Sequence, residues 1–303
     1  MKRFQKIFIL GAGAIGSLFG AFLSRKNDVV LIGEKEHLKT IKARGLKINE
    51  QIFWPKVQRE IKKIPKNSLI FLTTKAHQSL KAIKSIKPII RKDTVILVLQ
   101  NGLGQEELIK KELEEKCQIL RGITYLAAEF FKPGEIRTWL NKKTILPLSP
   151  EGEKIAKVLR PAGFQTEVTK EMEKEIWKKL VVNCLIGPLT ALFKVRNNEI
   201  AKESLKKVRK RIVKECLQIA AAEGINFEKN FGKEIEEKIS LYKNYSSMAQ
   251  DILKGRKTEI DFLNGKIIEL AKKHRLETPA NEVIYHLIKF REKIRDLKHL
   301  PVV

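Results

Sequence analysis

The 303-residue sequence has few of the residues that form disulfides or bind metals. Its three cysteines are odd in number, widely spaced and outside any CxxC or Cys/His pattern: Cys117, Cys184 and Cys216. This excludes the paired-cysteine framework of a small secreted domain. We therefore expect a reducing compartment and no metal site.

The sequence also lacks a signal peptide pattern and a long uninterrupted apolar run. The N-terminal MKRFQKIFIL leads directly into a strand-like segment, without a small-residue cleavage site. The longest apolar stretch, 177–193, is interrupted by Asn183 and Gly187-Pro188, so it falls short of the roughly 18 residues that span a bilayer. These absences predict a cytoplasmic protein with no membrane partner.

Acidic residues are too few to balance the basic ones. The chain has 61 Lys and Arg against 35 Asp and Glu, a net charge of +26, which raises nucleic-acid binding as an alternative function. However, the basic residues are spread along the chain and interleaved with Glu, as in KKELEEK and GKEIEEK, which is typical of solvated helix faces. We expect no nucleic-acid partner, and a positive field that favours small anionic molecules.

The first half of the chain predicts a dinucleotide site. The apolar run Ile7–Leu10 resembles a buried parallel strand, a helix-like segment follows, and the next strand is expected at Val29–Ile32. Between the first strand and the helix lies GAGAIG, in which a GxGxxG pattern provides a tight turn, a close approach to pyrophosphate and close helix packing. The expected cofactor contacts here are Gly11, Ala12, Gly13, Ala14, Ile15 and Gly16.

Three further positions in this half are candidate contacts. Glu34 ends the second strand, where a carboxylate binds the ribose hydroxyls and repels a 2′-phosphate; it favours NADH, whereas Lys35 could instead hold the phosphate of NADPH. Lys75 and Asn101 follow the expected strands Leu69–Leu72 and Val95–Leu99, at the edge of the sheet where ligands bind. The alternative for Asn101-Gly102 is an ordinary turn.

Between 119 and 168 the sequence predicts shorter elements: a hairpin turning at Pro133-Gly134, a helix at about 151–160 and a strand near Thr166–Val168. Beyond about residue 170 the pattern becomes helical throughout. We expect two domains: 1–168, an α/β Rossmann-type dinucleotide-binding domain, and 169–303, an all-α domain. Without a Gly/Ser linker between them, a crevice between the domains is the natural place for a substrate.

The second half contains two polar anomalies on apolar helix patterns. Lys179, Asn183 and Gly187 form a line along an otherwise apolar helix, so the line should face polar partners or a wet cleft, unless Lys179 extends outward to solvent. Glu259 shares a helical face with Leu263, Ile267 and Leu270, which places a carboxylate on an inner stripe. Pairing of Glu259 with Lys179 would explain both anomalies.

These motifs resemble the 2-dehydropantoate 2-reductase (ketopantoate reductase) family over essentially the whole chain. The resemblance is carried by GAGAIG (11–16), TTKAHQ (73–78), LQNGLG (99–104), WKKLVVNCLIGPLTAL (177–192), SSMAQD (246–251) and TEIDFLNG (258–265). It implies a Rossmann domain joined to a helical domain like the C-terminal domain of 6-phosphogluconate dehydrogenase. The implied activity is NAD(P)H-dependent reduction of 2-dehydropantoate to (R)-pantoate, in pantothenate and coenzyme A biosynthesis.

The resemblance also implies roles for individual residues. Lys179 matches the catalytic lysine and Glu259 a substrate-binding glutamate that acts beside it; Asn101, Asn183 and Ser247 match substrate contacts, and Lys75 lies near the cofactor. Two positions depart from the family pattern. Gly187 stands where another Asn is common, and Glu34 stands where many members have an arginine for the 2′-phosphate of NADPH. Family members outside pantothenate synthesis also exist, so a related reductase of another branched 2-oxo acid is the closer alternative. Exposed apolar surface on the last helices would indicate a homodimer.

Overall fold

The structure is a computed structural model that describes residues 3–140 and 143–294. It divides into two compact units. The first contains the described residues up to Gln100 and from Gly104 to Met172, and the second contains Asn101–Leu103 and the described residues from Glu173 on. The three residues 101–103 follow a strand of the first unit in the chain, yet group with the second.

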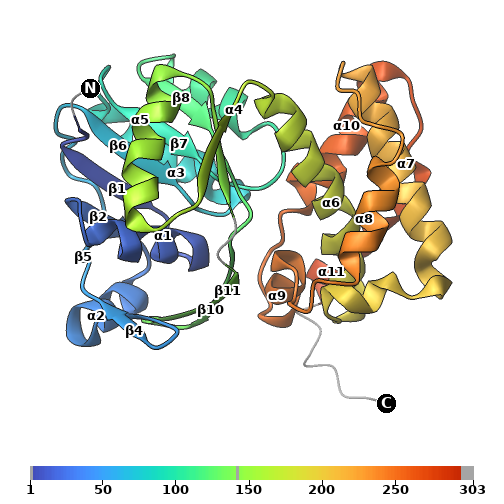
Figure 1. The fold of residues 1–303 in the computed structure, drawn as a ribbon, viewed down its shortest axis with the longest axis horizontal. Helices are drawn as coiled ribbons and strands as arrows, with labels where there is room; N and C mark the ends of the chain where they lie inside the picture. Colours follow the sequence, from blue (N-terminus) through green and yellow to red (C-terminus); the bar gives the residue numbers. More distant parts are fainter. Residues whose placement is uncertain (1–2, 141–142, 295–303) are drawn as a thin grey trace. The chain divides into compact units, whose positions relative to one another are not determined.

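A six-stranded parallel sheet forms the centre of the first unit (Figure 1). Its strand order is β5-β2-β1-β6-β7-β8, with β1 at Lys6–Leu10, β2 at Val29–Ile32, β5 at Lys56–Gln58, β6 at Ser68–Leu72, β7 at Val95–Val98 and β8 at Gln118–Arg121. The runs KIFIL, VVLI, SLIFL and VILV are almost fully buried, as continuous apolar strands in a parallel sheet must be. The predicted α/β class is confirmed.

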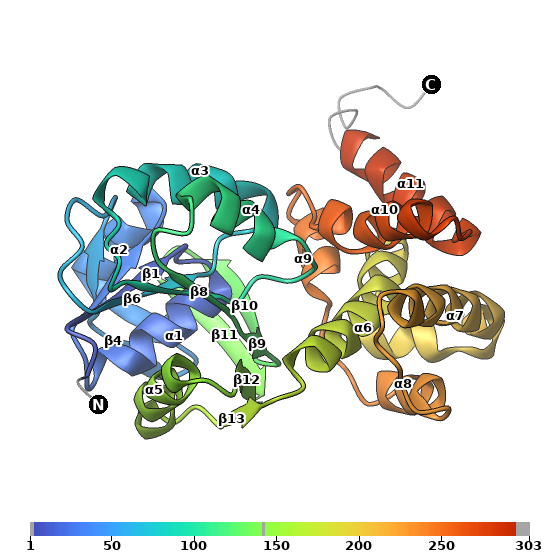
Figure 2. The same cartoon turned by 90° about the horizontal axis from the view of Figure 1, so that it is seen from above.

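Helices cover both faces of this sheet (Figure 2). One face packs on α3 (Ser79–Ile86) and α4 (Gln105–Leu113), through a core that includes Phe8, Ile83 and Ile109. The other packs on α1 (Ala14–Ser24) and α5 (Pro150–Leu159), through a core that includes Phe19 and Ile155. Alternate residues of β1 point to the two cores, because side chains alternate along a strand. Helix α2, at Lys35–Arg44, follows β2.

Two smaller sheets complete the first unit. One has the order β10-β11-β3-β4, with β3 at Leu46–Ile48, β4 at Gln51–Phe53, β10 at Ala127–Lys132 and β11 at Glu135–Leu140. The β10–β11 hairpin turns at Pro133-Gly134, as predicted. The other has the order β13-β12-β9, with β9 at Ile123–Thr124, β12 at Thr144–Pro147 and β13 at Thr166–Thr169.

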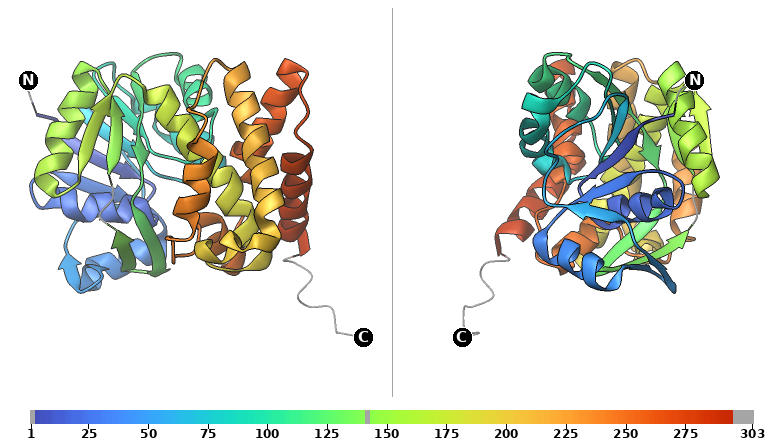
Figure 3. Two further views of the ribbon diagram at one scale, coloured as in Figure 1. Left: turned by 45° about the vertical axis from the view of Figure 1, so that its right-hand side comes forward. Right: turned by 90° about the vertical axis from the view of Figure 1, so that its left-hand side faces the viewer.

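The second unit is helical in all the elements described from residue 172 onward (Figure 3). Its core is built around α6 (Met172–Phe193), with α7 at Lys206–Ala222, α8 at Phe231–Ile239, α9 at Ser247–Leu253, α10 at Asn264–His274 and α11 at Pro279–Lys293. Short 3₁₀ turns lie at Asn197–Ala201 and Ile260–Phe262.

Helix α6 is the core helix predicted from its apolar sequence. Its 22 residues are long and apolar enough to cross a membrane by length and composition, so the expectation that no segment reaches this length is wrong. However, 67% of its apolar window is buried inside the fold, which is typical of a globular core helix. Pro188 lies inside the helix rather than ending it.

Candidate active site

The glycine turn after β1 is held tightly against the ends of the neighbouring strands. The N–H groups of Gly11 and Ala12 both donate to the Ile32 carbonyl, at 3.1 and 2.8 Å. Gly11 has φ +115°, and a Cβ there would lie 2.4 Å from the Thr74 nitrogen, while a Cβ on Gly16 would lie 2.1 Å from the Gly11 oxygen. The first and third glycines are therefore required by the chain itself.

The middle glycine is different, because nothing in the described chain requires it. Gly13 is exposed, its φ of −78° suits any residue, and a Cβ there would meet no atom within 4 Å. It precedes α1, whose first turn has no acidic residue and no side-chain cap. An open backbone at a helix N-terminus fits the pyrophosphate of a dinucleotide, whose close approach needs the space that a side chain would fill.

Polar side chains join the carboxyl ends of β1, β6 and β7. Thr73 Oγ1 donates to the Gly11 carbonyl at 2.8 Å, and Gln100 Nε2 donates to the Thr74 carbonyl at 2.7 Å. Ser79 Oγ donates to Gln100 Oε1 at 2.9 Å, so both the oxygen and the nitrogen of the buried Gln100 amide form hydrogen bonds. Lys75 follows directly and is half-buried. These bonds fix the backbone at the edge of the sheet where a cofactor would lie.

Glu34 and Lys35 lie just beyond β2, and both are exposed. Glu34 is the residue before α2, and its side chain makes no capping hydrogen bond with that helix. Its carboxylate is thus not committed to the helix N-terminus. Its reading of the ribose remains a prediction.

Helix α6 presents the predicted polar line of the second unit. Lys179 and Asn183 are half-buried, whereas Leu180 and Cys184 beside them are buried. Gly187, one turn further on, is buried, and a Cβ there would lie 3.4 Å from Met248 Cε. The space beside Gly187 is thus bordered by a thioether side chain of α9.

Glu259 is buried, as the pattern suggested, but the helix predicted for it is wrong. It precedes the 3₁₀ turn Ile260–Phe262, and α10 begins only at Asn264. Leu263 between them has φ −109° and ψ −104°, far from helical values, so the apparent helical stripe crosses a break in the backbone. A side chain that is only 6% exposed nevertheless places a carboxylate inside the unit.

The structure brings Asn101 to Glu259. Asn101 Nδ2 donates to Glu259 Oε2 at 3.2 Å, and Leu103 N–H donates to the Phe262 carbonyl at 3.0 Å. Gly102 has φ +86°, and a Cβ there would lie 2.2 Å from the Phe262 oxygen. The Asn-Gly pair is thus more than a surface turn, because it packs its backbone against the Glu259 segment.

Ser247 is the exposed first residue of α9. The preceding Ser246 caps this helix by accepting from Ala249 N–H at 2.9 Å, and its hydroxyl lies 2.7 Å from Thr190 Oγ1 of α6. Thr190, two residues beyond Pro188 on α6, therefore holds the start of α9 in place.

Asn197 is a candidate that the sequence did not reveal. It is buried, its N–H donates to the Asn244 carbonyl at 3.0 Å, and its Oδ1 has no hydrogen-bond partner among the described residues. A buried amide oxygen without a partner is costly unless a ligand or water binds it. Only the burial of Asn197 in the structure identifies it as a candidate, because the hydrophobic periodicity of the sequence does not predict the burial of this residue.

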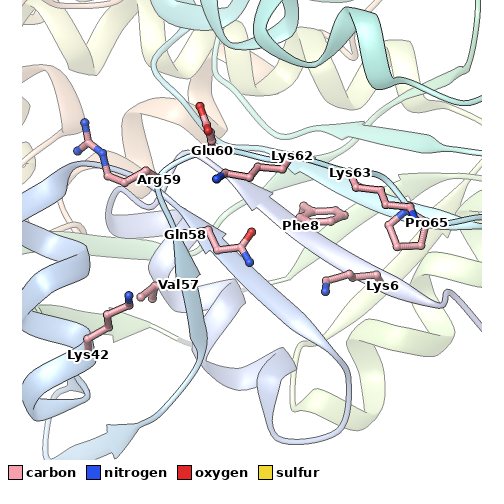
Figure 4. A pocket seen from close by; sticks show the side chains of 10 residues that line it. All are labelled: Lys6, Phe8, Lys42, Val57, Gln58, Arg59, Glu60, Lys62, Lys63 and Pro65. Carbon is pink, nitrogen blue, oxygen red and sulfur yellow. The ribbon is translucent and has the colours of Figure 1, made fainter.

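No group of three His, Cys, Asp or Glu side chains that could hold a metal occurs in the described ranges. A cavity of about 620 Å³ in the first unit lies elsewhere, lined by residues of β1, α2, β5 and the segment that follows β5 (Figure 4). None of the predicted site residues lines this cavity. Its lining includes five basic side chains: Lys6, Lys42, Arg59, Lys62 and Lys63.

Comparison with known proteins identifies the family. Residues 7–150 match "Ketopantoate reductase PanE/ApbA", and residues 171–292 match "Ketopantoate reductase PanE/ApbA C terminal". The 2-dehydropantoate 2-reductase of Pyrococcus abyssi is 38% identical, over 97% of this chain and 100% of that protein.

Two solved structures agree in fold. A PanE/ApbA family ketopantoate reductase from Ralstonia eutropha has a TM-score of 0.89 at 25% identity, covering 96% of this chain and 99% of that one. The ternary structure of D-mandelate dehydrogenase with NADH and anilino(oxo)acetate has a TM-score of 0.88 at 30% identity, with the same coverage. With matches over both units and a full-length relative at this identity, the chain belongs to the ketopantoate reductase family.

Proposed function

We propose that this protein is a 2-dehydropantoate 2-reductase that uses NADH or NADPH to form (R)-pantoate. The observation that carries this proposal is the hydrogen bond between Asn101 and the buried Glu259, which joins two motifs of the family at one place. The open glycine turn at Gly13 supports a dinucleotide as the cofactor.

The residues suggest how the reaction proceeds. Bound NAD(P)H would supply a hydride to the C2 ketone of the substrate. Lys179 stabilises the negative charge that grows on the ketone oxygen and donates the proton to it. Glu259, oriented by Asn101, accepts a hydrogen bond from the substrate hydroxyl, while Asn183 and Ser247 orient its other polar groups. The pairing of Lys179 with Glu259 remains part of the proposal.

The cofactor would be held by the first unit. We propose that the N–H groups of Gly11–Gly16 bind the pyrophosphate and that Glu34 binds the ribose, which favours NADH over the NADPH that is usual in this family. Lys75 and Asn101 would contact the cofactor near its reactive end.

The test is turnover by the purified protein. Mixed with 2-dehydropantoate, it should consume NADH, and NADPH in a parallel reaction, with pantoate formed in equal amount. If neither cofactor is consumed, the substrate assignment is wrong.

A second substrate class is favoured by one observation. Met248 borders Gly187, so an apolar surface stands where many relatives carry an amide. Such a surface suits a less polar 2-oxo acid, and a similar structure is a D-mandelate dehydrogenase. Higher kcat/KM for a branched or aromatic 2-oxo acid than for 2-dehydropantoate would favour this alternative.

We further propose a cytoplasmic enzyme without nucleic-acid or membrane partners, which forms a homodimer. Helix α11 supports the dimer, because three large apolar side chains are exposed on it: Val283 is 62% and Phe290 61% exposed, and the exposed Leu287 lies between them. Residues at i, i+4 and i+7 share one helix face. Leu287→Lys should shift the sedimentation of the protein from dimer to monomer, and a wild-type monomer would refute the proposal.

A further inference from the structure

Pro188 leaves a buried carbonyl of α6 without its usual donor. In an α-helix the N–H of residue 188 would donate to the carbonyl of residue 184, but proline has no N–H. The turn concerned spans residues 184–188 and directly follows Asn183, and both Cys184 and Pro188 are buried. A buried carbonyl left without a donor is destabilising, so a replacement donor is expected.

The replacement donor is the side chain of Asn264. Its Nδ2 donates to the Cys184 carbonyl at 3.0 Å, and the residue is fully buried. Asn264 is the first residue of α10, and it follows directly on the Glu259–Leu263 segment. A residue 80 positions away along the chain thus completes the hydrogen bonding of α6.

Asn264 is itself held by a buried polar chain. The same Nδ2 donates to Asn281 Oδ1 at 2.9 Å, and Asn281 Nδ2 donates to Glu215 Oε2 at 2.9 Å. Glu215 also accepts from Arg211 Nε at 2.8 Å and from the N–H groups of Ala280 and Asn281 at the start of α11. The amide of Asn264 therefore has a fixed orientation, which a merely space-filling side chain would not need.

The Glu259 segment has separate attachments to α11. Thr258 N–H donates to Glu292 Oε1 at 2.6 Å, and Tyr285 Oη donates to Asp261 Oδ1 at 2.9 Å. These bonds hold the segment to α11, whereas Asn264 ties its far end to α6 beside Asn183. The distance between Glu259 and the polar line of α6 then depends on Asn264.

We propose that Asn264 is a positioning residue, which uses the carbonyl freed by Pro188 to set Glu259 against the α6 turn that carries Asn183. It touches neither substrate nor cofactor in this role, and its effect on turnover rests on the proposed function. Loss of the amide should displace Glu259 while leaving the glycine turn of the first unit unchanged.

The test is the Asn264→Ala substitution, made once in the wild-type protein and once in the Pro188→Ala variant. Asn264→Ala should lower kcat/KM for 2-dehydropantoate by about a hundredfold, the scale expected for a misplacement of about 1 Å, through both a higher KM and a lower kcat. Cofactor binding, followed by fluorescence titration, should be unchanged. The Asn264→Ala substitution should also lower Tm, because the Cys184 carbonyl loses its donor.

Pro188→Ala separates positioning from a structural role, since an alanine at this position can donate its own N–H to the Cys184 carbonyl. The double variant Pro188→Ala/Asn264→Ala should regain most of the Tm but keep the kinetic defect. Recovery of both Tm and kcat/KM would reduce Asn264 to a structural donor and overturn the proposal. So would normal kinetics in Asn264→Ala. If the single variant does not fold, the double variant carries the kinetic test.

Ile288→Ala is the matched control for instability. Ile288 is fully buried on α11, so its truncation lowers Tm through a cavity and should leave KM and kcat per folded molecule unchanged. A kinetic loss in Ile288→Ala equal to that of Asn264→Ala would overturn the proposal, because general loosening would explain both.

A readout that needs no substrate keeps the two proposals distinct. Amide hydrogen exchange at Phe262 and Leu263 should be about tenfold faster in the double variant than in Pro188→Ala. If the wild type reduces no 2-oxo acid, the proposed function fails, and exchange still decides the positioning role. Unchanged exchange at these amides would refute the positioning role even in an active enzyme.

Discussion

The glycine turn of the first unit and helix α6 of the second prepare for ligands by opposite means. At the turn, the key positions are glycines without side chains. Gly11 and Gly16 allow close contacts between backbone segments, and Gly13 leaves open space beside the backbone. At α6, polar side chains are added to a helix that is otherwise buried, with Lys179 and Asn183 half-buried among apolar residues. Backbone N–H groups suit a phosphate that many enzymes share, whereas side chains suit one particular substrate.

The largest effect should come from the side-chain half of this comparison. Lys179→Ala should reduce kcat by about 10³-fold, since it removes the proposed proton donor and its charge. Cofactor binding, measured by fluorescence titration, should persist because the glycine turn is intact.

Lys178→Ala is the matched control, because Lys178 is the neighbouring lysine on α6 and pairs with Glu175 at 2.6 Å on the same helix. It should retain near-normal turnover. Near-normal kcat in Lys179→Ala would remove Lys179 from the mechanism.

The backbone half predicts the reverse pattern. Gly13→Ala adds a methyl group where the described chain has free space, so Tm should hold or rise slightly. The methyl group would meet the pyrophosphate, and we expect the Kd for NADH to rise by about a hundredfold. Calorimetric titration and a thermal melt of the same sample measure both.

Gly163→Ala serves as its control, because a Cβ there also meets no atom within 4 Å, far from the glycine turn in the sequence. Its φ of +91° is strained for alanine, so Tm should fall while the cofactor Kd stays constant. An unchanged Kd in Gly13→Ala would show that no ligand approaches this backbone.

The glycine turn should also be sensitive to pH through His37. His37 Nδ1 accepts from Gly134 N–H at 2.9 Å, and its Nε2 lies 3.0 Å from Ser17 Oγ, which donates to the Ala12 carbonyl. Burial lowers the pKa of His37 to about 4 from its usual 6.5. Between pH 6.5 and about 4 the unfolded chain thus binds a proton that the folded protein does not.

Stability should therefore fall as the pH is lowered through this window, by about 2 kcal/mol between pH 7 and 5 for this group. Urea unfolding at the two pH values measures the loss. His37→Asn should be less stable at about pH 7 but should lose less stability on acidification through the same window. A drop of the same size in the variant would assign the pH dependence to other groups.

Local features were predictable from the sequence, and contacts between distant segments were not. GAGAIG lies between a strand and a helix, so its glycine spacing was sufficient to predict the turn. Glu259 shows the limit. Its burial was predicted, but the helix predicted from its four-residue spacing to Leu263 does not form, because the backbone departs from helical geometry at Leu263. Its bond with Asn101 joins residues 158 positions apart, which no periodicity can show.

The same limit applies to Asn264 and Pro188. The sequence presents Gly187-Pro188 as an interruption, and the expected result of a proline is a bent or broken helix. The structure shows an unbroken α6, in which a side chain from α10 donates to the carbonyl that Pro188 leaves without its usual donor. The replacement depends on tertiary packing, so it cannot be read from either segment alone.

A smaller effect should distinguish the two cofactors. Glu34→Arg replaces an exposed carboxylate after β2 with a cation that can bind a 2′-phosphate, so the ratio of kcat/KM for NADPH to that for NADH should rise by about tenfold. Parallel assays with both cofactors measure the ratio. Glu36→Arg, an exposed glutamate in the first turn of α2, adds the same charge two residues away and should change the ratio less. Equal ratios in the two variants would show that Glu34 does not read the ribose.

The smallest effect is expected at Gly187, where the two ways of preparing a site meet in one residue. Gly187 is a glycine, but it lies inside α6 and not at a turn, and a Cβ there would be in ordinary contact with Met248 at 3.4 Å. Gly187→Ala should therefore raise the free energy of unfolding by up to about 1 kcal/mol, because alanine favours a helix interior. The kcat/KM for 2-dehydropantoate should stay within about threefold, since a methyl group against a thioether removes no polar contact. If kcat/KM instead falls by much more while stability rises, Gly187 resembles Gly13: its missing side chain leaves space for a ligand, and this turn of α6 must then admit part of the substrate.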